Sequence, residues 1–207
     1  DGATGSNLIA AGMPRGVSTE LWALEHPEVL IGLQRAYVDA GSQIIYAPTF
    51  GGNRINLMNY GLEKQTVRLN TALVRLSKEA AGGRALVAGN LTTTGKALEP
   101  VGEMTYGQLY GIYQEQISAL AEAGVDLLAV ETMMGVEETA AALDAAQSVC
   151  SLAVLCSLSV EADGSALFDG GAVDGDTALA EAALSARCFY HLADLGVPFV
   201  QNEYGEF

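Results

Sequence analysis

Asp1 and Glu131 are the two carboxylates whose positions in the sequence favour a role in chemistry. Glu131 closes an apolar run at residues 125–130, and Asp1 is expected to follow directly on a strand. Two carboxylates across the mouth of one site could hold an ammonium group, act as acid and base, or bind a divalent cation. Each could instead cap the helix or loop that follows it, as short acidic side chains often do. The spacing alone leaves these alternatives open.

The loop at residues 1–5 reads Asp-Gly-Ala-Thr-Gly. Its glycines permit backbone N–H groups to turn inward and hold an anion, such as the carboxylate of a substrate. A loop that accepts an anion, beside carboxylates that accept a cation, is what a free amino acid requires. The residue types therefore point to an amino-acid substrate, with an ordinary glycine-containing turn as the alternative.

The elements that must position these residues alternate along the chain. Apolar runs predict strands over residues 42–48, 84–90, 125–130 and 151–160. Apolar residues at helical spacing predict helices over residues 27–40, 62–81, 105–123 and 136–149. A further helix over 177–195 and a short strand over 197–201 are predicted in the tail. This alternation indicates a parallel sheet, either closed as a barrel or open and doubly wound.

Two observations favour the barrel. The loop at residues 1–5 lacks the glycine spacing of a dinucleotide-binding turn, and no helix is predicted to open at Gly5. Polar residues follow the strand ends, where barrel enzymes keep their chemistry; they are Asp1, Thr49, Asn90 and Glu131. We therefore predict an α/β fold of the (β/α)8 TIM-barrel type, in one domain over residues 1–207.

The length qualifies this prediction. The chain has 207 residues, whereas a full barrel usually needs about 250. We expect the barrel to be incomplete, or to lack segments that the natural protein has. Because the first residue is Asp1 rather than Met, and no basic-then-apolar signal peptide is seen in the sequence, the chain is also expected to begin inside a longer protein, just after a strand.

Composition excludes several classes of partner. The formal net charge is -15, so phosphate backbones and anionic lipid surfaces are repelled, and we expect neither nucleic acid nor membranes as partners. No apolar run approaches the length of a membrane span. The three cysteines form no disulfide framework, which suits the reducing cytoplasm.

Several motifs, in chain order, resemble the homocysteine S-methyltransferase family. The loop at residues 1–5 is similar to the opening motif of the family, residues 47–54 (Ala-Pro-Thr-Phe-Gly-Gly-Asn-Arg) to its second-strand motif, and residues 130–132 (Val-Glu-Thr) to its fourth-strand motif. Residues 59–62 (Asn-Tyr-Gly-Leu) also resemble the barrel module of cobalamin-dependent methionine synthase. The resemblance covers residues 1–164 and leaves 165–207 as a poorly matched tail.

The resemblance implies transfer of a methyl group to the sulfur of homocysteine, giving methionine. In the family, carboxylates matching Asp1 and Glu131 hold the amino group of the substrate, and loop amides matching Gly2 and Ala3 receive its carboxylate. A zinc ion bound by three cysteines keeps the sulfur as a thiolate. The methyl donor would be methylcobalamin on a corrinoid protein or domain, a methylated folate-linked system, or a small methyl-onium compound. The expected substrate-binding residues are Asp1, Gly2, Ala3, Thr49, Asn53 and Glu131.

The sequence departs from the family at the zinc site. It contains no Gly-Gly-Cys-Cys-Gly run, and Cys150, Cys156 and Cys188 match none of the family's ligands. Cys188 and His191 could share a metal, but a lone pair without a third ligand is more often structural. No catalytic or metal residue is therefore assigned. One alternative is a zinc-less barrel homologue that acts as a binding module or as a docking module for a corrinoid protein. Another is an unrelated barrel lyase or aldolase with Glu131 as base.

Overall fold

The computed structural model describes residues 1–160 and 166–167. Within this part, one parallel sheet runs in the order β1-β2-β3-β4, so each strand pairs with the next along the chain. The strands are β1 (Ile44–Tyr46), β2 (Leu86–Leu91), β3 (Leu127–Met133) and β4 (Ala153–Leu158). A parallel α/β architecture is thus confirmed, whereas closure into an eight-stranded barrel stays a prediction.

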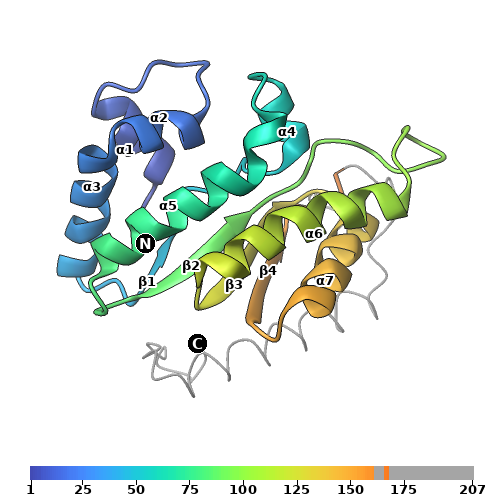
Figure 1. Cartoon of the computed structure of the whole chain (residues 1–207). Coiled ribbons are helices and arrows are strands. Elements are labelled where there is room, and N and C mark those ends of the chain that lie inside the picture. Colours follow the sequence, from blue (N-terminus) through green and yellow to red (C-terminus); the bar gives the residue numbers. More distant parts are fainter. Residues whose placement is uncertain (161–165, 168–207) are drawn as a thin grey trace.

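Helices cover one face of the sheet. The crossovers between strands contain α5 (Thr66–Ala81), α6 (Tyr106–Ala123) and α7 (Val136–Val149), which lie side by side on this face in Figure 1. Before the sheet, α3 (Pro27–Asp39) packs against α5 and β1. All four were predicted from apolar residues at helical spacing. In the structure, a glycine in the left-handed conformation follows the last residue of α5 and of α6, at Gly82 and Gly124.

Side chains alternate between the two faces of the sheet. Leu128 and Val130 belong to the main core cluster, against the helices. Leu127 and Ala129 belong to a smaller cluster on the opposite face, which we call the inner face. By the same alternation, the last inner-face positions of the four strands are Tyr46, Asn90, Glu131 and Ser157. The pleat of the sheet therefore gathers polar side chains at one end of the inner face.

The prediction that no helix opens at Gly5 is wrong. The loop leads directly into α1 (Thr4–Ala10), whose N-cap residue Ala3 offers no side-chain hydrogen bond. The short helix is instead stabilised by tertiary packing, since Leu8 is fully buried in a cluster with Trp22 and Leu30. Because this burial comes from distant parts of the chain, the local sequence carries no signal for the helix.

Three further short elements were not predicted. They are α2 (Thr19–Glu25), α4 (Arg54–Met58) and a 3-10 helix (Glu63–Gln65) at the start of the segment predicted as one helix over 62–81. The strands also differ from the predictions at their ends, and β3 extends beyond residue 130 to include Glu131. The predicted helix over 177–195 and the strand over 197–201 lie outside the described residues, as do Cys188 and His191.

No helix in the described part of the chain is both long and apolar enough to cross a membrane.

Candidate functional site

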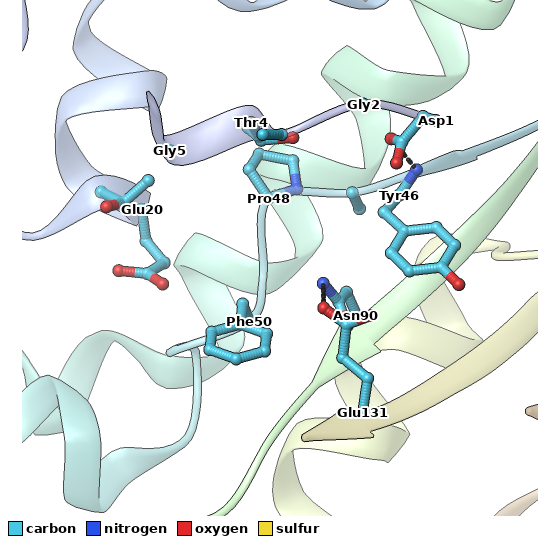
Figure 2. A pocket seen from close by; sticks show the side chains of 13 residues that line it. Asp1, Gly2, Thr4, Gly5, Glu20, Tyr46, Pro48, Phe50, Asn90 and Glu131 are labelled. Atoms are coloured by element: carbon cyan, nitrogen blue, oxygen red, sulfur yellow. Dashed lines mark hydrogen bonds between the residues drawn. The ribbon is translucent and has the colours of Figure 1, made fainter. Parts of the chain in front are cut away.

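A pocket of about 570 Å³ opens at the carboxyl ends of β1, β2 and β3. Figure 2 shows its walls, which come from the first loop, α2, the segment after β1 and the ends of β2 and β3. Among the described residues, three carboxylates line it and no Lys, Arg or His side chain does. The pocket therefore favours a ligand with a positively charged group. The lining residues are Asp1, Gly2, Ala3, Thr4, Gly5, Thr19, Glu20, Tyr46, Ala47, Pro48, Phe50, Asn90 and Glu131.

Asp1 is fixed beside β1. Its Oδ2 accepts a hydrogen bond of 2.8 Å from the backbone N–H of Tyr46, as Figure 2 shows. The next residue, Gly2, passes so close to the ring of Tyr37 that a Cβ there would lie 2.7 Å from Cε1 of the ring. Asn7 ties the loop to the same ring, because its Nδ2 donates to the Ala3 carbonyl at 2.7 Å and to the Tyr37 hydroxyl at 3.0 Å.

The backbone N–H groups of this loop could donate hydrogen bonds to a ligand. Among the described residues, the backbone N–H groups of Gly2 and Ala3 donate to no protein acceptor. Both residues are exposed and line the pocket. An anionic group in the pocket would supply the missing acceptor.

Glu131 stands across the pocket from the loop and is oriented by Asn90. The Asn90 Nδ2 donates to Glu131 Oε1 at 3.3 Å. The Asn90 backbone is held in turn by Thr49, whose Oγ1 donates to the Asn90 carbonyl at 2.7 Å and accepts from the Asn90 N–H at 3.1 Å. A chain of hydrogen bonds thus runs from the loop after β1, through the end of β2, to the carboxylate on β3.

Thr49 and Asn53 do not line the pocket, although they were grouped with its residues on sequence. Both are fully buried. Besides bracketing Asn90, Thr49 accepts at its carbonyl from Gln116 Nε2 at 2.8 Å. Asn53 caps α4 by accepting from the Asn56 N–H at 2.9 Å. The structure brings Asp1, Gly2, Ala3 and Glu131 together and leaves Thr49 and Asn53 beneath the pocket wall.

Sequence reasoning missed Glu20, the third carboxylate of the pocket. It is 6% exposed, and its two oxygens accept from the Ser18 hydroxyl at 2.8 Å and the Gly51 N–H at 2.9 Å. Glu20 therefore links α2 to the turn that carries Phe50. The signal that could have found it is Ser18, a capping residue ahead of an apolar stretch, which marks the start of α2.

Tyr46 and Phe50 provide the aromatic walls and were not predicted either. Burial raises the pKa of the Tyr46 phenol, and the negative charge of Glu131 raises it further. Tyr46 thus stays a neutral hydrogen-bonding group at physiological pH. Its position follows from the alternation along β1, in which Ile44 and Tyr46 share the inner face.

The described residues do not form the zinc site of the resemblance. Among residues 1–160 and 166–167, no group of three or more His, Cys, Asp or Glu side chains could hold a metal ion. Cys150 caps the end of α7 with its Sγ 3.6 Å from the Ala146 carbonyl, and Cys156 lies within β4. Neither cysteine lines the pocket.

Comparison with known proteins supports the sequence resemblance. The family model for homocysteine S-methyltransferase matches residues 1–193. The fold resembles that of the homocysteine methyltransferase MmuM from Escherichia coli, with TM-scores of 0.71 for both its oxidized and metallated forms. The identities are 23% and 22%; the matches cover 86% and 89% of this chain, but only 66% and 68% of MmuM. The chain belongs to the homocysteine S-methyltransferase family.

Proposed function

We propose that this chain binds homocysteine in the pocket beneath its first loop and serves the transfer of a methyl group to the homocysteine thiol, giving methionine. The observation that carries the proposal is that hydrogen-bond acceptors and hydrogen-bond donors face the same pocket. Asp1 and Glu131 can accept hydrogen bonds from an ammonium group, and the N–H groups of Gly2 and Ala3 can donate to a carboxylate. Homocysteine carries both groups on one carbon.

The residues of the chain bind and orient the substrate in this proposal. Asn90 donates a hydrogen bond to Glu131 and so orients the carboxylate that would accept hydrogen bonds from an ammonium group. Thr49 acts through Asn90, and Asn53 by shaping the turn after β1. With the amino-acid end held between the loop and β3, the thiol is left to react. In the transfer, an S–CH3 bond forms, the bond between methyl and donor breaks, and the thiol loses its proton.

The methyl donor belongs to the same proposal. It is a methylated corrinoid on a protein or domain, a folate-linked system, or a methyl-onium compound. Zinc would hold the sulfur as a thiolate in a family member that binds it. Since the described residues supply no ligand set for zinc, we assign no step to that ion.

Calorimetric titration of the whole chain with homocysteine tests the proposal. Glu131→Gln should weaken binding by about 1–3 kcal/mol, because a charged hydrogen-bond partner is lost. Glu122→Gln is the matched control, since Glu122 is exposed on α6 and does not line the pocket. If the unmodified chain does not bind homocysteine at millimolar concentration, the proposal is wrong.

The alternative is a homologue that binds homocysteine or docks a corrinoid protein without methylating the thiol. The 207 residues contain no adjacent cysteine pair, so they do not by themselves include the zinc ligands of the resemblance. The two functions separate in an assay of methionine formation from homocysteine and a methylated donor. Methionine formed in proportion to the chain supports the enzyme, whereas binding without turnover supports the alternative.

A further inference from the structure

The strand that carries Glu131 is interrupted directly after it. Val130 pairs with Cys156 and Met133 pairs with Leu158, so Glu131 and Thr132 together oppose the single residue Ser157. Two residues against one is a β-bulge. Such bulges occur frequently next to active sites, where they redirect a side chain.

The bulge reverses the alternation of side chains along β3. Regular alternation would place Met133 on the inner face with Leu127 and Ala129. Met133 instead packs in the helix-side cluster with Val130. The extra residue is therefore absorbed between Glu131 and Met133, which leaves Glu131 as the last inner-face side chain of β3 and returns the strand to the core directly behind it.

Thr132 has an unfavourable backbone conformation. Its φ is 56°, and it is the single non-glycine residue with positive φ in the described part of the chain. A β-branched residue rarely adopts this left-handed region, because its Cβ meets the backbone. Such a conformation persists only where neighbouring groups hold it, and it is concentrated at functional sites.

Two hydroxyls contact the backbone of Thr132: that of Thr92, which donates to the Thr132 carbonyl at 3.5 Å, and that of Ser157. The Thr132 N–H donates to Ser157 Oγ at 3.2 Å. The side chain of Ser157 thus replaces the backbone acceptor that a regular ladder would supply. The backbone ladder resumes beyond the bulge, where the Ser159 N–H donates to the Met133 carbonyl at 2.7 Å.

We propose that Thr132 and Ser157 are positioning residues, which form a latch that aims the Glu131 carboxylate into the pocket. Asn90, on β2, then holds the Glu131 carboxylate, while Ser157, on β4, holds the backbone directly after Glu131. Neither latch residue lines the pocket, so both act through Glu131. The identity of the ligand rests on the proposed function, but the placement of Glu131 does not.

The ionisation of Tyr46 reports where the Glu131 carboxylate lies without any ligand. The negative charge of Glu131 contributes to the raised pKa of Tyr46, so moving the carboxylate away from the phenol, or neutralising it, should lower that pKa. In chains labelled with carbon-13 at the tyrosine ring, NMR titration would follow Tyr46, assigned by Tyr46→Phe. Glu131→Gln and Ser157→Ala should both lower its pKa. In the Glu131→Gln background, Ser157→Ala should produce no further shift.

Matched variants distinguish loss of the latch from a general disturbance of the fold. Ser157→Thr keeps the hydroxyl and should restore the Tyr46 pKa. Ser148→Ala removes a hydroxyl on α7 whose Oγ donates to the Ala145 carbonyl, and should leave Tyr46 unchanged. Should Ser157→Ala fail to fold, Ser157→Cys, with a much weaker acceptor, should lower the Tyr46 pKa in its place.

Homocysteine affinity supplies the second measurement. Ser157→Ala should raise the Kd about fivefold, the order expected for one hydrogen bond, and should have no effect in the Glu131→Gln background. If Ser157→Ala leaves both the Tyr46 pKa and the Kd unchanged, the latch is refuted while the proposed function stands. If the unmodified chain does not bind homocysteine but Tyr46 responds as described, the latch stands and the proposed function fails.

Discussion

The hydroxyl of Thr49 brackets the backbone of Asn90, donating to its carbonyl at 2.7 Å and accepting from its N–H at 3.1 Å. One buried side chain therefore fixes the end of β2 from the loop after β1. Because the Asn90 side chain in turn donates to Glu131, the bracket sets the position of a carboxylate that Thr49 does not contact itself.

Replacing Thr49 by valine should be destabilising, although the shapes are alike. The backbone N–H and carbonyl of Asn90 would lose their partner inside the protein, at a cost of about 1–3 kcal/mol in the free energy of unfolding. Thr49→Ser keeps the hydroxyl and should recover most of this loss. Urea denaturation of the two variants checks the prediction, and equal stability of Val and Ser variants would count against it.

Gly52 has no room for a side chain. A Cβ there would lie 2.6 Å from Asn70 Oδ1 and 2.8 Å from the Thr49 carbonyl. Gly52→Ala should therefore lower the free energy of unfolding by about 1–3 kcal/mol, as overpacking does. The contrasting control is Gly111→Ala on α6, where a Cβ meets nothing within 4 Å. That change should stabilise the chain by about 0.5–1 kcal/mol, so thermal melts should move in opposite directions.

Glu138 on α7 joins the loop after β2 to the helix layer. It is 2% exposed and accepts hydrogen bonds from the Thr93 hydroxyl, from both the N–H and the hydroxyl of Thr94, and from the Tyr113 hydroxyl. In Glu138→Gln, one carboxylate oxygen is replaced by an NH2 group. This group donates hydrogen bonds, so it would face protein groups that are donors themselves and could not accept from them. We expect a loss of about 1.5–3 kcal/mol in the free energy of unfolding, the range for hydrogen bonds to a charged group. Chemical denaturation measures it, and the exposed Glu122→Gln should show no such loss.

Tyr106 should ionise at unusually high pH. Its hydroxyl donates to Asp144 Oδ2 at 2.5 Å, and this hydrogen bond raises the pKa of Tyr106 to about 12. Because the folded pKa lies above the ordinary value near 10, the contact stabilises the fold fully below pH 10 and is lost as pH rises towards 12. The absorbance of tyrosinate during a pH titration should show that Tyr106 ionises near pH 12, and Asp144→Asn should lower the pKa of Tyr106 towards 10. An unchanged titration after that substitution would contradict the assignment.

The periodicity of apolar residues predicted the helices and strands that bury one whole face in the core. The four strands and the helices α3, α5, α6 and α7 follow from apolar runs and helical spacing. The short helix α1 was missed because its stability comes from burial of Leu8 against distant residues, which no local pattern records. The sequence also gave no sign of the bulge at Thr132, since threonine is an ordinary strand residue.

The candidate site was predicted in outline. Polar residues after strand ends indicated the end of the sheet at which the pocket opens, but not which of them face it. The pleat decides this: Asn90 and Glu131 occupy inner-face positions, whereas Thr49 lies beyond the end of β1 and turns towards the Asn90 backbone. Glu20 reaches the pocket from a helix outside the sheet, so strand-end reasoning could not include it.

We propose that Asp1 and Glu131 hold the amino group of homocysteine, and a comparison of two ligands tests this directly. Calorimetry would measure the Kd of homocysteine and of 4-mercaptobutanoate, which lacks the amino group, for the unmodified chain and for Glu131→Gln. We predict that the unmodified chain prefers homocysteine and that Glu131→Gln reduces this preference by about 1–3 kcal/mol, while the Kd of 4-mercaptobutanoate does not rise. If Glu131→Gln leaves the preference for homocysteine unchanged, Glu131 does not hold the amino group.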